Sequence, residues 1–185
     1  NILKQSDINN MLNDFLSELS QKLIKIKMDF ETSNDEKKFL AGIKNFTGNA
    51  ISDENLIDFG KLDTKEFIKK ILNIFSEKRE EKVKLIGAVQ FQDLEKKIFL
   101  QILDFSWRAH LQYLEQLRQV IGLRSYGQKD PLAEFRREAF QLFEDLLFKI
   151  KTETIKFLIN TNIVIQDKKE EKQTINLKKK RKISR

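Results

Sequence analysis

Two long segments with helical spacing of apolar residues lie on either side of the short polar stretch LRSYGQKDP, residues 123–131. Side chains three or four positions apart share one face of a helix, so each segment has a continuous apolar face. A connection this short allows the two helices to pack side by side in opposite directions. We therefore predict an antiparallel hairpin with arms at 91–121 and 131–159. The residues predicted to face the other arm are Ile98, Ile102, Phe105, Ala109, Leu114, Leu117 and Ile121 in the first arm, and Leu132, Phe135, Ala139, Leu142, Leu146, Ile150 and Phe157 in the second.

Pro131 marks the start of the second arm. Its ring disfavours the α conformation at Asp130 and suits the first position of a helix. The Asp130 carboxylate can cap the free N–H groups of that helix, and Gly122 and Gly127 permit the chain to reverse its direction. The sequence therefore predicts a defined turn rather than a floppy loop.

Tyr126 is an aromatic residue in this polar turn, between Arg124 and Lys129. It gains little from a hydrophobic core that it cannot easily reach, so we predict that its side chain is exposed. Two interpretations stay open at this point: contact with a partner, or local capping of the turn.

Further helices are predicted before the hairpin. The chain contains one proline and six glycines, so few residues interrupt a helix. The one strand-like stretch, 162–165, is too short to found a sheet. The sequence predicts an all-α fold in which amphipathic helices pack around the hairpin. These helices are expected at 7–28, at 34–46, around 54–59, and from 64 either to Gly87 or through it.

Local signals support the starts of these helices. Ser6 is predicted to cap the first helix. Ser33 and Glu36 have the spacing of a capping box, in which each residue hydrogen-bonds a backbone N–H of the other. Asp63 and Glu66 have the same spacing, and they predict the start of the helix that leads toward the hairpin.

The net charge of +7 belongs mainly to the C-terminal segment. Residues 167–185 hold nine Lys or Arg and three Asp or Glu, which leaves 26 basic against 25 acidic residues in 1–166. The low apolar content of that segment predicts disorder, and its KKKRK motif at 178–182 could bind nucleic acid, acidic lipid or nothing specific. The other charge run, EKREEKVK at 77–84, is interpreted as a solvated helix face.

Enzyme and metal motifs are weak. Gly122 and Gly127 have the spacing of a P-loop, but Gln128 follows them, and the preceding segment is helical rather than a strand. With one histidine and no cysteine in the sequence, no metal cluster or thiol nucleophile is predicted. The absence of cysteine fits a reducing compartment. No apolar run approaches the roughly 20 residues that span a bilayer.

Several aromatic residues of the hairpin have competing interpretations. His110 is predicted to be a partly buried histidine, hydrogen-bonded within the helix packing, and Trp107 to lie in a core or an interface. Phe140, Phe143 and Phe148 make the apolar stripe of the second arm wider than one face needs. Packing against the first helices explains most of this width, and a groove for a partner explains the rest.

Residues 100–159 resemble the C-terminal part of SecA, the ATP-driven motor of bacterial protein export. The resemblance is strong in the order and spacing of three motifs. A weaker resemblance covers residues 1–90, which are similar to the family's helical wing and its flanking segments. The motifs are LD-x-x-W-x-x-HL at 103–111, LRQ-x-I-x-LR-x-Y-x-QKDP at 117–131 and E-x-x-RE-x-F at 134–140.

The resemblance implies an organisation and a role. It implies the wing and flanking helices at 1–90, the two-helix finger of the helical scaffold at 91–160, and a basic tail at 161–185. In SecA the finger tip lies at the mouth of the SecY channel and contacts the translocating preprotein. The corresponding tip residues are Leu123, Arg124, Tyr126, Gln128 and Lys129, and Trp107 and His110 would have regulatory or packing roles.

The resemblance also implies partners and a location. These are the SecY channel, an unfolded preprotein and the remaining motor domains, on the cytoplasmic face of the bacterial inner membrane, with a possible acidic-lipid contact of the tail and a possible homodimer. ATP and magnesium would bind the motor domains, and no cofactor is expected in this chain. The first residue is asparagine and not methionine, which favours a piece of a longer protein.

Two alternatives remain at this stage. The basic tail favours a helical nucleic-acid-binding module with a basic arm, although the near-neutral remainder of the chain argues against a broad electrostatic footprint. The surplus phenylalanine surface favours a helical scaffold that dimerises.

Overall fold

The computed structural model describes residues 5–123 and 130–163, with side chains from residue 10 onward. This part of the chain forms helices and no strand, which confirms the all-α fold. The helices are α1 (Gln5–Ser33), α2 (Glu36–Thr47), α3 (Asp53–Gly60), α4 (Thr64–Ile86), α5 (Ala88–Val120) and α6 (Pro131–Asn160).

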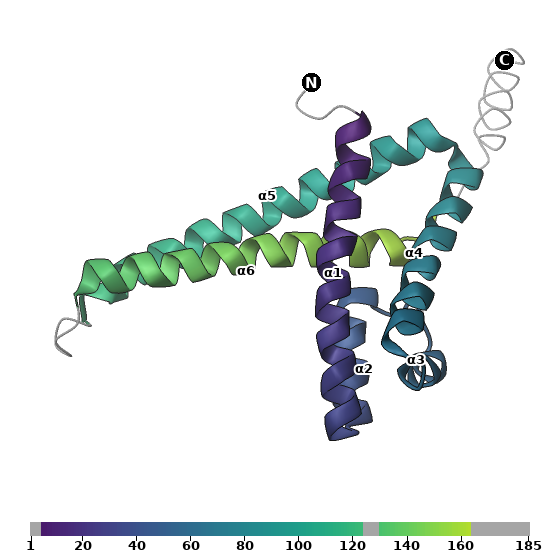
Figure 1. Ribbon diagram of the computed structural model, residues 1–185. Helices are drawn as coiled ribbons and strands as arrows, with labels where there is room; N and C mark the ends of the chain where they lie inside the picture. The colour runs from purple at the N-terminus through teal and green to yellow at the C-terminus, as the bar shows by residue number, and fades with distance from the viewer. Residues whose placement is uncertain (1–4, 124–129, 164–185) are drawn as a thin grey trace, which may run out of the picture.

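The predicted hairpin is formed by α5 and α6, which run antiparallel and extend well beyond the other helices (Figure 1). Ile98 and Leu117 of α5 and Leu146 of α6 are buried as predicted. Helix α1 crosses the hairpin near its base, where Phe15 contacts Phe99 with ring centroids 6.2 Å apart (Figure 1). The part of the hairpin beyond this crossing is therefore supported mainly by the pairing of its own two arms.

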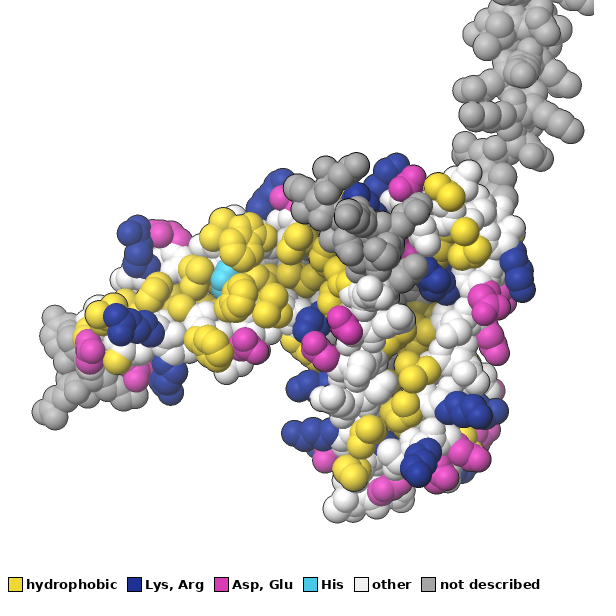
Figure 2. Space-filling view, turned by 45° about the horizontal axis from the view of Figure 1, so that its top comes forward, with side chains coloured by type: hydrophobic (Ala, Val, Ile, Leu, Met, Phe, Trp, Pro, Cys, Tyr) yellow, Lys and Arg dark blue, Asp and Glu magenta, His cyan; other side chains and the backbone are white. Residues whose placement is uncertain are grey.

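The prediction was wrong for Phe105, Leu132 and Phe157, which are exposed. Phe105 is the clearest case, with 71% of its surface accessible, whereas the neighbouring Ser106 is buried. One residue along a helix is a rotation of about 100°, so the side chain after Phe105 faces the other arm and Phe105 itself does not. Figure 2 shows that hydrophobic side chains cover much of one outer face of the hairpin.

Helices α1 to α4 form the second part of the molecule, which we call the body. Its fully buried side chains include Leu23 of α1, Phe39 of α2 and Phe67 of α4. Ile155 and Ile159, near the end of α6, belong to the same buried cluster. The base of the hairpin is thus part of the body's hydrophobic core.

The boundary between α1 and α2 differs from the prediction. Ser33 was predicted to cap α2, but it is the last residue of α1, and its hydroxyl donates to the carbonyl of Asp29. Asp35 is the cap instead, because its Oδ1 accepts from the N–H of Lys38 at 3.0 Å. Asn34 ends α1 in the left-handed conformation (φ 52°), which asparagine tolerates better than most residues.

Two other helix boundaries are also informative. Helix α1 already includes Gln5, so it starts before the predicted position at residue 7. Gly87 separates α4 from α5, which decides between the two predicted alternatives. Its φ of 89° is rarely adopted by residues with a side chain, so glycine allows the chain to turn there.

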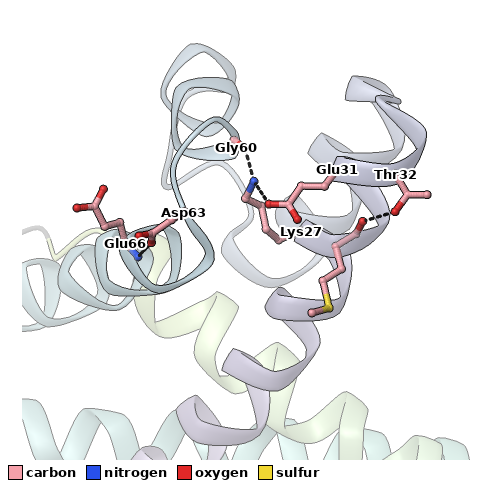
Figure 3. A network of polar contacts seen from close by, with 7 residues as sticks. Lys27, Glu31, Thr32, Gly60, Asp63 and Glu66 are labelled. Carbon is pink, nitrogen blue, oxygen red and sulfur yellow. Dashed lines mark hydrogen bonds and ion pairs between the residues drawn. The ribbon is translucent and has the colours of Figure 1, made fainter.

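The cap of α4 was predicted correctly. Asp63 Oδ1 accepts from the N–H of Glu66 at 2.7 Å (Figure 3). Because one free N–H of the helix loses its acceptor, Asp63→Ala is expected to lower the free energy of unfolding by about 1 kcal/mol. Urea denaturation measures this loss. Asp58→Ala is the control, since Asp58 makes only an exposed ion pair with Lys61, and it should change stability by less than about 0.5 kcal/mol. Equal losses in the two variants would contradict the capping role.

Candidate functional site

The far end of the hairpin is the predicted contact site. After α5, residues 121–123 form a short 3₁₀ turn, in which Ile121 is buried and Leu123 is 66% exposed. Exposure of a leucine at the end of a long hairpin makes it available for contact. The other predicted tip residues, Arg124, Tyr126, Gln128 and Lys129, lie outside the described residues, so their roles remain predictions.

The start of α6 closes the other side of this turn. Asp130 Oδ1 accepts from the N–H of Leu132 at 3.0 Å, and Pro131 is the first residue of the helix. This confirms the predicted cap. The carboxylate also lies at the positive end of the helix dipole, which favours it there. The two chain segments that flank the turn are therefore held in place by the buried Ile121 and by this cap.

Trp107 and His110 lie together in the middle of the hairpin. Their ring centroids are 5.7 Å apart, and the His110 ring lies 6.2 Å from that of Phe143 in the other arm. His110 is buried, more completely than predicted, whereas Trp107 keeps much of its surface exposed. At a rise of 1.5 Å per residue, His110 is about 20 Å from Leu123. These two residues therefore do not belong to the tip.

An exposed apolar surface surrounds His110, and Figure 2 shows it beside the histidine. It combines side chains spaced three or four residues apart on each arm, and the contact between His110 and Phe143 joins the two sets. We call this surface the hairpin apolar patch; its members are Trp107, Leu111, Phe140, Phe143 and Leu147.

The patch revises the interpretation of the phenylalanine stripe. Phe148 does pack inward, edge-on to Phe46 of α2 with centroids 6.0 Å apart. Phe140 and Phe143 are exposed instead, so packing against the first helices accounts for only one of the three. The sequence indicated an excess of apolar surface, but it could not show which residues were in excess.

The charge run at 77–84 is not a uniformly solvated face, contrary to the prediction. Arg79 makes two parallel hydrogen bonds to the buried Glu95 of α5, Nε to Oε1 at 2.7 Å and Nη2 to Oε2 at 2.9 Å. This bonding raises the pKa of Arg79, against the opposing effect of burial. Lys82 is buried, and its burial lowers its pKa. Lys78 lowers the pKa of Lys82 further, and Glu81 opposes the shift.

A cavity of about 680 Å³ lies where α1, α4, α5 and α6 meet. Leu12, Phe75 and Ile155 contribute to its apolar lining, and the Arg79–Glu95 pair forms part of its wall. In the part of the chain that the structure describes, no three or more His, Cys, Asp or Glu side chains form a group suited to hold a metal ion. Among the described helices, none combines the length and the apolar character needed to cross a bilayer.

A long hairpin that projects from a small helical body, with an apolar side face and an exposed end, defines a helical interaction module. The model of one protein family, the SecA wing and scaffold domain, matches residues 1–162. The chain therefore belongs to the SecA family.

Individual relatives agree with this assignment. The protein translocase subunit SecA of Pelagibacter ubique is 40% identical over 163 residues, which are 88% of this chain and 19% of the relative. The SecA subunit of Polynucleobacter necessarius is 34% identical over 167 residues, 88% of this chain and 18% of the relative. That of Hyphomonas neptunium is 49% identical over 83 residues, 45% of this chain and 9% of the relative.

The chain thus spans about a fifth of the length of the first two of these relatives. No solved structure matched it.

Proposed function

We propose that this chain is the wing-and-finger part of a protein translocase motor subunit. Its hairpin is the finger, and the tip contacts an unfolded preprotein at the mouth of the SecY channel. The single observation that carries the proposal is a hairpin that projects from a body whose family relatives are named protein translocase subunits. In this proposal, ATP hydrolysis, with its magnesium ion, belongs to the motor domains of the intact subunit.

The shape of the hairpin suits the transmission of force. Helix α5 has 33 residues and α6 has 30, so the longer arm measures about 50 Å. Two paired helices resist bending better than one, and the end of α6 is buried in the body's core. A movement of the body would therefore reach the tip as a movement of the whole hairpin.

The hairpin apolar patch supports a second part of the proposal. An apolar surface of this kind is typical of an interface, and the chain covers only 19% of its Pelagibacter relative. We propose that the patch packs against the remaining motor domains, which would shield it from water in the intact subunit. A second copy of the subunit is the alternative occupant.

The proposed role also implies a location in the cell. A finger that meets SecY must work at the cytoplasmic face of the inner membrane, where acidic lipid headgroups attract basic segments. The KKKRK motif at 178–182 could contribute to that attraction. The segment lies outside the described residues, so both its predicted disorder and its lipid contact remain predictions.

Substitution of Tyr126 tests the role of the tip. In the intact translocase subunit, Tyr126→Ala is expected to slow preprotein transport into membrane vesicles about fivefold to tenfold, because a contact worth about 1 kcal/mol or slightly more is lost. Tyr113→Ala is the matched control. Tyr113 is the other tyrosine of the chain and is exposed on α5 away from the turn. Transport that is equally fast in both variants and in the parent protein would contradict the proposal.

A further inference from the structure

Lys82 lies in the middle of a strongly charged run, yet only 8% of its surface is exposed. Its ammonium group donates to the carbonyl oxygen of Leu158 at 2.5 Å and to that of Ile159 at 3.0 Å. Both acceptors belong to the last turn of α6, 76 and 77 residues away in the sequence. A side chain of the body therefore binds the end of the hairpin directly.

The last carbonyl groups of a helix have no acceptor role within the helix, and they form the negative end of its dipole. A buried ammonium group donates hydrogen bonds to these carbonyl groups and also places a positive charge at the negative end of the dipole. Local donors reach the carbonyl groups of Lys156 and Phe157, through Asn160 and Thr161. The carbonyl groups of Leu158 and Ile159 receive their donor from α4. On another side, Asn160 Nδ2 donates to the carbonyl of Thr47 at the end of α2, at 2.8 Å. The end of α6 is bound by two helices of the body.

Arg79 lies three residues before Lys82 and so shares its side of α4. It pairs with Glu95 of α5. The same side of α4 therefore binds both arms, α5 through Arg79 and α6 through Lys82. The two attachments are not equivalent, because α5 is also joined to α4 through the peptide chain at Gly87. The end of α6 is held to α4 by non-covalent contacts alone.

We propose that Lys82 is a positioning residue that sets the direction of the hairpin relative to the body. Core packing and the Asn160–Thr47 hydrogen bond hold the end of α6 in the body. Lys82 fixes this end relative to α4, and so it sets where the tip points. This effect on the direction of the hairpin does not depend on the proposed function, whereas its importance for transport does.

Lys27 is a matched control within the same chain. It is also a buried lysine, with 2% of its surface exposed, and it donates to the carbonyl of Gly60 at the end of α3 at 2.5 Å (Figure 3). It also pairs with Glu31 at 2.7 Å. Every one of these partners lies in the body. Replacement of Lys27 therefore disturbs a helix cap of the same kind without touching the hairpin.

The test measures the distance between hairpin and body in the 185-residue chain. The sequence contains no cysteine, so Gln119→Cys on α5 and Lys37→Cys on α2, both exposed positions, can carry spin labels. Pulsed electron paramagnetic resonance then gives the distribution of the distance between the labels. We expect one narrow peak in the parent and in Lys27→Met, loss of that peak in Lys82→Met, and its return in Lys82→Arg, which keeps the donors.

A narrow peak at the parent distance in Lys82→Met would overturn the proposal, as would equal broadening in Lys27→Met. If Lys82→Met does not fold, Lys82→Gln, which keeps an amide donor, is measured in its place. If both fail to fold while Lys27→Met folds, Lys82 is needed for the fold itself, and the positioning role is wrong. The resonance measurement involves no transport, so Tyr126→Ala should slow transport in the intact subunit and keep the narrow peak in the 185-residue chain. The two proposals can therefore fail separately.

Discussion

Replacing Arg79 by methionine is expected to lower the free energy of unfolding by about 3–5 kcal/mol, the usual cost of leaving a buried charge without its partner. Only 1% of the Glu95 side chain is exposed, and Arg79 supplies both of its close hydrogen bonds, at 2.7 and 2.9 Å. Methionine fills much of the same space but donates no hydrogen bond. The carboxylate would then be buried beside the apolar cavity without a cation.

The reverse substitution, Glu95→Gln, is the informative control. The Arg79 side chain is 42% exposed, so its guanidinium group remains hydrated when the carboxylate is removed. Glutamine also retains an acceptor oxygen. We expect a loss of about 1–2 kcal/mol, clearly smaller than that of Arg79→Met. Urea denaturation with unchanged m-values measures both losses. Equal losses would show that the burial of Glu95 does not determine the cost.

The second large effect is expected in the core of the body. Phe67 is fully buried, and its ring lies 6.0 Å from that of Phe39. Phe67→Ala removes that ring and leaves a cavity that the surrounding helices cannot completely fill. The expected loss is about 3–5 kcal/mol, which should be visible as a large decrease of the urea midpoint. Helices α2 and α4 would both lose packing at this point.

Phe105→Ala is the matched control for that substitution. The ring of Phe105 is 71% exposed, so its removal creates no cavity and should change the free energy of unfolding by less than about 0.5 kcal/mol. If Phe105→Ala were as destabilising as Phe67→Ala, the hairpin would pack differently from the structure. The pair also tests the one hairpin position at which the sequence prediction was most clearly wrong.

Local signals account for what could be predicted. Asp130 with Pro131, and Asp63 with Glu66, start helices as expected, because each cap is a contact between residues two or three positions apart. The arms of the hairpin could be predicted for a similar reason, since helical periodicity is a property of neighbouring residues. Ser33 shows the limit, because Asp35 two residues later offered a competing cap and formed it.

Contacts between distant parts of the chain account for what was missed. The partner of Arg79 is 16 residues away, across a glycine turn, and those of Lys82 are 76 and 77 residues away. Nothing in the run EKREEKVK distinguishes these two cations from their solvated neighbours. The same limit applies to the hairpin apolar patch, because exposure of Phe140 depends on where α1 crosses the hairpin and not on the spacing of apolar residues.

The candidate site was predicted from a different kind of signal. The composition of the turn indicated an exposed aromatic, and the resemblance to SecA supplied a partner for it. The structure confirms the cap at Asp130 and shows that Leu123, on the other side of the turn, is exposed. Tyr126 lies outside the described residues, so its exposure remains a prediction. The family assignment rests on the match over residues 1–162.

The central claim is that Tyr126 touches the polypeptide that is being moved. A photo-crosslinking amino acid placed at 126 in the intact translocase subunit, with a preprotein stalled during transport, tests this most directly. We expect a strong crosslink from 126 to the stalled preprotein and only background from the same amino acid at 113, the exposed control position on α5. A verified stalled preprotein that crosslinks no more from 126 than from 113 would contradict the claim.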